Sequence, residues 1–91
     1  MKLFLCGFCE DIVRLIRDEN RYCMCKKSFG RYLDSNQAVY GGNAIPIGMH
    51  NGDLIKAVGH WACHEKADIR AWTFAKDAPT YTREETKGTE K

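Results

Sequence analysis

Hydrophobic and polar positions alternate in short runs along the first half of the chain, and Gly, Asn, Asp and Ser separate these runs. Residues 2–6 and 12–16 are the first two apolar segments, and their pattern predicts strands. The apolar spacing within 12–16 also fits one and a half turns of helix, so periodicity alone leaves this segment open between the two.

A hairpin is predicted next in the chain. Residues 31–33 and 37–40 flank Asp34-Ser35-Asn36, whose side chains favour a turn. The glycine-rich turn 41–43 then leads into a third extended segment at 44–49. Because Pro46 has no backbone N–H, we expect this segment to be an edge strand or an extended loop.

One helix is predicted, and Asn51-Gly52-Asp53 gives its start signal, with Asn51 or Asp53 as the capping residue. A single apolar stripe follows and carries the helix to about Lys66, formed by Leu54, Ile55, Val58, Trp61 and Ala62. Residues 68–75 return to an extended pattern. The fold class is therefore α+β, with Phe8, Trp61 and Phe74 expected in the core.

The chain has 91 residues, 44% of them hydrophobic and 29% charged, which predicts one globular domain and excludes collagen-like and coiled-coil repeats. The apolar pattern stops after Phe74, so we expect a domain over 1–76 and a flexible tail over 77–91. The apolar run before Glu10 and Asp11 is too short for a secretory signal, which favours a cytoplasmic protein.

Five cysteines are the unusual feature of the composition. A C-x2-C pair (Cys6, Cys9) and a C-x-C pair (Cys23, Cys25) are separated by thirteen residues. A turn brings the first two sulfurs together, and an extended segment points the second two the same way. This spacing predicts a structural zinc site, with iron bound in a rubredoxin-like manner as the alternative. Unconnected buried thiols and catalytic thiol chemistry are weaker alternatives.

The predicted metal site bears on function in two ways. Four thiolate ligands leave the ion no open position for a water molecule, so we expect no enzyme and no catalytic residues. The formal net charge of +2 also falls to about zero once four thiolates and one divalent ion are counted, which weakens a nucleic-acid-binding interpretation.

A second group of ligand-type residues lies on the predicted helix. His60, Cys63 and His64 share one face of it, away from the apolar stripe. They could bind a metal ion, but an exposed polar face explains them more simply. We expect no structural metal there.

The glycine-rich stretch 41–52 is a candidate ligand-binding segment. Gly48 and Gly52 precede the helix start, where free N–H groups suit an anion, although ordinary turn chemistry is the alternative. We expect a second copy of the chain to complete the surface. The predicted contacts are Tyr40, Asn43, His50 and Asn51, with Arg31 or Arg70 adding positive charge.

The chain resembles the small zinc-ribbon-like proteins encoded by phages and prophages over about residues 1–75. The motifs that carry this resemblance are Cys6-x2-Cys9-x-Asp11, Arg21-x-Cys23-x-Cys25, Gly30-Arg31-Tyr32-x-Asp34, Ala38-x-Tyr40 and Pro46-Ile47-Gly48-x2-Asn51. Lys26 stands after the second cysteine pair, where these relatives usually have glycine.

This resemblance implies a zinc-ribbon-like β-sheet domain with a non-enzymatic, anti-defence type of role in the host-cell cytoplasm. Its partner would be a host protein or a sequestered anionic ligand of the nucleotide type. Because so small a domain buries little surface, we also expect a homo-oligomer. A zinc ribbon that binds nucleic acid or the transcription machinery is the alternative.

Overall fold

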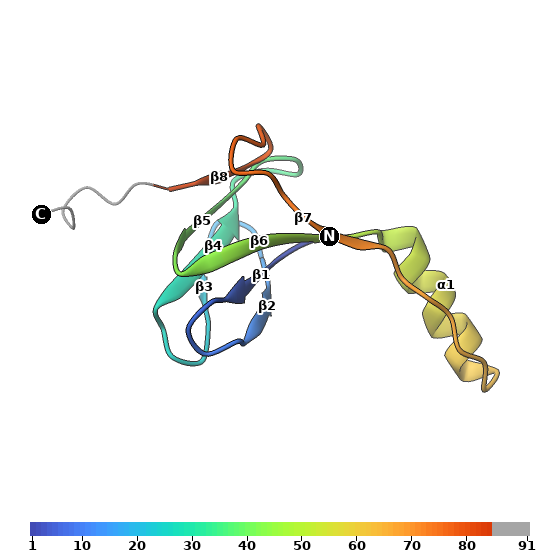
Figure 1. Cartoon of the computed structure of the whole chain (residues 1–91). Coiled ribbons are helices and arrows are strands. Elements are labelled where there is room, and N and C mark those ends of the chain that lie inside the picture. Colours follow the sequence, from blue (N-terminus) through green and yellow to red (C-terminus); the bar gives the residue numbers. More distant parts are fainter. Residues whose placement is uncertain (85–91) are drawn as a thin grey trace, which may run out of the picture.

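The computed structural model describes residues 1–84. It consists of two four-stranded sheets and one helix (Figure 1). The α+β prediction is confirmed. The helix, α1 (Asn51–Ala62), is not long and apolar enough to cross a membrane. The first sheet has the order β2-β1-β6-β7, with β1 at Lys2–Cys6, β2 at Ile12–Arg14, β6 at Ala44–Met49 and β7 at Ala71–Thr73. The second has the order β3-β4-β5-β8, with β3 at Arg21–Tyr22, β4 at Ser28–Tyr32, β5 at Ala38–Gly42 and β8 at Tyr81–Arg83.

The first predicted strand, β1, is confirmed at both of its ends and pairs antiparallel with β2 and β6. Its alternating side chains place Phe4 and Cys6 on the buried face. The open choice for residues 12–16 is also resolved, because Ile12 pairs with Leu5 in the β1–β2 ladder. This segment is a strand, and β2 ends at Arg14.

The expectation that residues 44–49 form an edge strand or a loop is wrong. β6 is an interior strand, paired with β1 on one side and β7 on the other. Pro46 is tolerated because its carbonyl, which accepts from the Phe74 N–H at 3.0 Å, faces the β7 side of the strand. Its nitrogen faces the same side, just beyond the Ile47–Thr73 pair that ends the β6–β7 ladder. The missing N–H therefore costs only the reciprocal bond to Phe74 at the end of this ladder, and the pairing of β6 with β1 is unaffected.

The predicted hairpin is confirmed, with longer strands than expected. β4 and β5 pair from Ser28–Gly42 to Tyr32–Ala38. Asp34 shapes the turn between them, because its Oδ1 accepts hydrogen bonds from the backbone N–H groups of Asn36 and Gln37, both at 2.8 Å.

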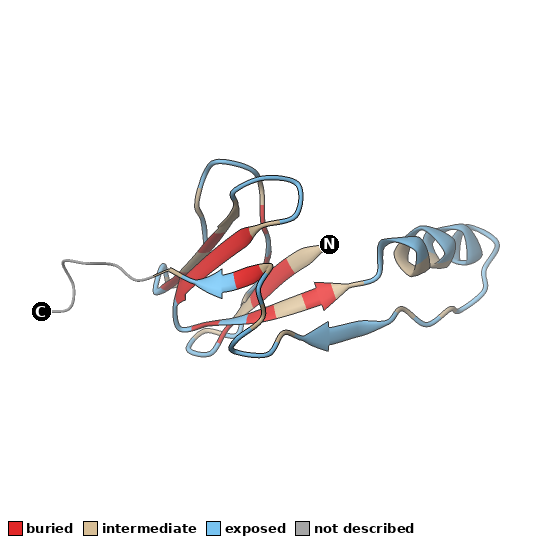
Figure 2. Cartoon of the chain, turned by 90° about the horizontal axis from the view of Figure 1, so that it is seen from above, coloured by how far each residue is buried: buried red, intermediate tan, exposed pale blue. Residues whose placement is uncertain are grey.

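The core lies between the two sheets (Figure 2), where Phe4, Leu15 and Tyr81 are almost fully buried. Tyr81 comes from β8, which pairs parallel to β5, and its hydroxyl donates to the Leu3 carbonyl at 2.7 Å. The prediction of a flexible tail is therefore wrong for residues 77–84. Residues 77–84 contain a core aromatic residue and a sheet strand, whereas 85–91 lie outside the described residues.

Residues 51–70 form an arm that projects away from the sheets, with α1 running out and a segment returning to β7 (Figures 1 and 2). No residue of α1 is buried. The expectation that Trp61 and Phe8 lie in the core is wrong, because their exposed fractions are 76% and 64%. Phe74 is half-buried and packs against the core. The apolar stripe predicted the helix correctly. However, α1 follows the end of β6 and lies beyond the edge of the core, so its stripe is not buried there.

Both ends of α1 differ from the prediction. His50 is the N-terminal cap, since its Nδ1 accepts from the Asp53 N–H at 3.1 Å, while the Asp53 carboxylate binds Arg70 instead. The helix ends at Ala62 rather than near Lys66. His64 has a φ of 64°, and the N–H of Glu65 donates to the His60 carbonyl at 2.7 Å, which closes the last turn.

Candidate functional site

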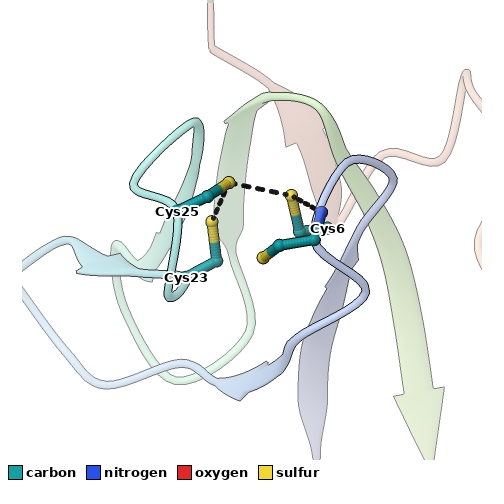
Figure 3. Close-up of side chains that lie close together, drawn as sticks. Cys6, Cys23 and Cys25 are labelled. Atoms are coloured by element: carbon teal, nitrogen blue, oxygen red, sulfur yellow. Dashed lines mark hydrogen bonds between the residues drawn. The ribbon is translucent and has the colours of Figure 1, made fainter.

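Four cysteines from two separate turns meet at one end of the sheets (Figure 3). Cys6 ends β1 and Cys9 lies in the turn that follows it, whereas Cys23 and Cys25 lie between β3 and β4. All four sulfur atoms are within 4.8 Å of one another. This is the only cluster of three or more metal-ligating side chains within residues 1–84. The structure thus brings together the four cysteines that the spacing predicted.

The distances between the sulfurs fit a metal ion rather than disulfides. The Sγ atom of Cys25 lies 3.7 Å from that of Cys6 and 3.5 Å from that of Cys23. A disulfide needs about 2.05 Å, and all of these thiols are free. Four sulfurs bound tetrahedrally at about 2.3 Å from one ion lie about 3.8 Å apart. The four cysteines could therefore hold one metal ion.

Each cysteine pair lies in a tight backbone turn, which we call a knuckle (residues 6–10 and 23–26). In the first, the N–H groups of Phe8 and Cys9 donate to the Cys6 sulfur at 3.3 and 3.4 Å. In the second, the Lys26 N–H donates to the Cys23 carbonyl at 3.0 Å. Both knuckles end in a left-handed residue, since Glu10 and Lys26 each have a φ of 64°. Glycine adopts this conformation most easily, so the two side chains there impose strain.

Polar groups that the sequence reasoning did not single out as site residues fix the two knuckles to each other. The buried Ser28 hydroxyl donates to the Cys6 sulfur at 3.1 Å. Asp11 accepts from the Met24 N–H at 2.8 Å and so connects the first knuckle to the second. Ser28 gives no signal of its own in the sequence, because its role depends on the approach of β4 to β1.

The thiols of the cluster ionise unequally. Burial opposes ionisation of Cys6, but hydrogen bonds from Ser28, Cys9 and Phe8 outweigh it and lower the pKa of Cys6 to about 6. Burial raises the pKa of Cys25 to about 12, and the neighbouring thiols add to this rise. Thiolates packed this closely repel one another. A bound cation would remove that repulsion and let all four cysteines act as thiolate ligands.

The second group of ligand-type residues does not form a comparable cluster. The Nδ1 atom of His60 lies 2.9 Å from a carboxylate oxygen of Glu65. Cys63 is the C-terminal cap of α1, and His64 is the left-handed residue that ends it. The architecture of the helix end thus accounts for the positions of all three.

The residues predicted to bind a ligand are spread over the molecule. Asn43 lies at the turn before β6, where its carbonyl accepts from the Gly7 N–H at 2.8 Å and its N–H donates to the Lys27 carbonyl at 3.2 Å, so it supports both knuckles. His50 lies at the opposite end of β6, where it caps α1. Asn51 binds the N-terminal ammonium group at 2.6 Å.

The two predicted arginines are also apart from each other and have acidic partners. Arg31 forms a two-pronged pair with Glu84, with both N···O distances at 2.9 Å. Arg70 binds Asp53 at 2.7 Å, close to the start of α1. The positive charge of Arg70 is therefore paired within the chain, and the Asp53 N–H at this helix start donates to His50.

Tyr40, the remaining predicted ligand residue, lines a cleft at the open edge between the two sheets. The cleft has a volume of about 510 Å³ and is bounded by β5, β6, β8 and the segment after β7. The Tyr40 ring packs edge-on against Tyr81 at a centroid distance of 5.3 Å, and Phe74 does the same at 5.1 Å. The lining residues are Tyr40, Ala44, Ile45, Pro46, Thr73, Phe74, Lys76 and Arg83.

If the four cysteines hold a metal ion, loss of one cluster thiol should remove it. We expect Cys6→Ser to abolish stoichiometric metal binding and to unfold the knuckles, because a structural metal of this kind contributes roughly 10 kcal/mol to folding. Cys63→Ser is the matched control, since Cys63 is exposed on the arm. Elemental analysis and circular dichroism of both variants make the measurement. A folded Cys6→Ser protein with unchanged metal content would contradict the assignment, as would metal loss in the control.

The left-handed Lys26 provides a second test. We expect Lys26→Gly to raise the free energy of unfolding by about 0.5–1 kcal/mol, because glycine adopts a φ of 64° without strain. Lys27→Gly is the neighbouring control and should lower it by a similar amount, since that position has no positive φ. Chemical denaturation of the metal-loaded proteins measures both. Equal destabilisation by the two substitutions would rule out backbone strain at Lys26.

Comparison with known proteins adds no relative to this picture. No family model, curated protein or solved structure matches the chain. The resemblance to phage zinc-ribbon-like proteins therefore stays a prediction, and the function has to be argued from the four-cysteine cluster and the cleft themselves.

Proposed function

We propose that this chain is a zinc-stabilised, non-enzymatic binding protein that holds a small anionic ligand in the cleft between its sheets. The observation that carries this proposal is the cleft itself. Its volume of about 510 Å³ falls in the range of small-molecule sites. It also combines apolar walls with two cationic side chains, as binding sites for amphipathic ligands do.

The proposed ion is zinc, because it favours a tetrahedral set of four cysteine thiolates in small structural sites. Iron binds the same ligand set in rubredoxin-like sites, so metal analysis distinguishes the two. Four thiolates close the coordination sphere and leave no position where a water molecule could be activated. This chemistry supports a structural role for the ion and a binding role for the protein.

The shape and charge of the cleft suit a ligand with a flat ring and an acidic group. Tyr40, Pro46 and Phe74 supply apolar walls on which a planar ring can stack. Lys76 and Arg83 supply positive charge, and neither forms a salt bridge with an acidic residue inside the described part of the chain. A nucleotide combines a planar base with a phosphate, which Arg binds through paired hydrogen bonds.

This proposal fits the role that the resemblance implies. A nucleotide-type ligand held in the cleft would be sequestered from the other proteins of a host cell. Binding of a host protein would be a separate activity and needs a different surface.

Binding of adenosine 5′-monophosphate tests the cleft. We expect this nucleotide to raise the melting temperature of the metal-loaded protein and adenosine, which lacks the phosphate, to do so less. Arg83→Gln should weaken binding in calorimetry by about tenfold to a hundredfold, the value of one charge-assisted hydrogen-bond pair. Arg14→Gln, a change at an exposed strand position, is the control and should leave binding unchanged.

Two outcomes would contradict the proposed ligand class. One is the absence of a thermal shift with all four common nucleoside 5′-monophosphates. The other is a shift that persists undiminished in an Arg83→Gln, Lys76→Gln double variant. The second outcome would move the binding site away from the cleft.

A nucleic-acid-binding role is a second candidate, favoured by the surface around the knuckles. Phe8, Tyr22 and Met24 are exposed there. The Lys27 ammonium group lies 5.0 Å from the centre of the Phe8 ring. Exposed aromatic rings beside basic side chains are typical of surfaces that stack single-stranded bases.

Salt dependence tests this second candidate. If the knuckle surface binds nucleic acid, a fluorescent single-stranded oligonucleotide should bind in anisotropy titrations, and its affinity should fall steeply as salt rises. Lys27→Gln should weaken this binding and reduce its salt dependence by about one unit of slope. A weak response to salt, or no binding at low salt, would exclude phosphate-backbone recognition.

A further inference from the structure

The arm presents an apolar surface that the returning segment covers only in part. The six apolar residues of α1 lie at spacings that place them along one side of the helix. Ile55 is 71% exposed, Val58 58% and Trp61 76%. A helix of 12 residues is marginally stable in water without tertiary packing. A partner that covers the apolar side of α1 would therefore stabilise this helix.

A groove lies beside this apolar surface, between α1 and the returning segment. Its volume is about 420 Å³. The apolar walls are formed by Leu54, Ala57, Val58, Trp61, Ala67 and Ile69. The groove thus offers an apolar recess next to the most exposed large side chain of the arm.

The two walls of the groove are held in place by the base of the arm. Asp53 accepts hydrogen bonds from the backbone N–H of Arg70 at 3.0 Å and from its guanidinium group at 2.7 Å. The His50 N–H donates to the Arg70 carbonyl at 2.9 Å. These contacts fix the returning segment against the start of α1, so the recess is preformed at that end.

We propose that the occupant of this groove is a second copy of the chain. In this dimer the two α1 helices lie antiparallel, and Trp61 of each copy enters the groove of the other. The projecting Trp61 indole and the recess belong to the same surface. One two-fold axis therefore places the indole of each copy in the recess of the other. The polar side of α1, with Lys56 and Cys63, faces away from the contact.

The area available matches a small but specific dimer. A tryptophan side chain contributes about 150–250 Å² when buried. Two indoles and the aliphatic residues beside them bury on the order of 1,000 Å² in total, the lower limit for specific interfaces. The dimer would leave the cleft and the knuckles open, because both lie toward the start of β6 whereas α1 follows its end.

Sedimentation velocity of the metal-loaded full chain tests this dimer. We expect a species of twice the 10.4 kDa chain mass that dissociates on dilution. Trp61→Gln and Val58→Gln should each raise the dissociation constant at least tenfold. Lys56→Gln, on the opposite side of the same helix, is the matched control and should leave it unchanged. Metal content should be the same in all of these proteins, whereas the helical circular-dichroism signal should fall only in the variants that dissociate.

Tryptophan fluorescence gives an independent measurement. The chain has two tryptophans, so Trp72→Phe leaves Trp61 as the only indole. Its emission should shift to the red on dilution, with the same midpoint as the change in mass. A monomer at every concentration would overturn the proposal. So would a dimer that Trp61→Gln and Val58→Gln leave intact, or an arm that binds only a different protein.

Discussion

The meeting of four thiols in a small volume is the constraint on which the rest of the structure depends. Four ionised sulfurs within 4.8 Å repel one another strongly unless a cation lies among them. Their positions connect the end of β1 to the segment before β4, so they join one sheet to the other. Ser28 and Asp11 then orient the sulfurs and the knuckle backbone. In a short chain with a small core, such a link supplies stability that a larger hydrophobic interior would provide in a longer chain.

The two sheets are joined at the cysteine end and remain apart along one edge. Tyr81 fills the space between them, and its hydroxyl bonds to the Leu3 carbonyl. Next to Tyr81 the cleft separates the two sheets. Tyr40 and Phe74 both pack against the Tyr81 ring there. The cysteine cluster therefore links the sheets while the open edge beside it supplies a recess, which separates the structural role from the proposed binding role. The arm is a third region, stabilised by polar contacts at its base and exposed along its length.

The proposed function rests on this division rather than on any single motif. A closed four-thiolate site offers no catalytic position for a metal-bound water. The glycine-rich segment predicted to bind a ligand serves at two separate places, because Asn43 supports the knuckles and His50 and Asn51 support the start of the arm. Among the predicted ligand residues, Tyr40 is the one that reaches the cleft.

The sequence by itself determined the features that depend on local spacing. Cysteine spacing was sufficient to predict the four-sulfur cluster, because each pair is positioned by its own turn. Alternation predicted β1 and the hairpin around Asp34, and the apolar stripe predicted α1. The tertiary structure alone decided the features that depend on contacts between distant residues. Tyr81 enters the core, Lys76 and Arg83 reach Tyr40, and Pro46 lies inside a sheet because β8 pairs with β5 and β7 with β6. A periodic pattern states which side of an element is apolar, but not whether the core or open solvent lies beside it, and for α1 it was solvent.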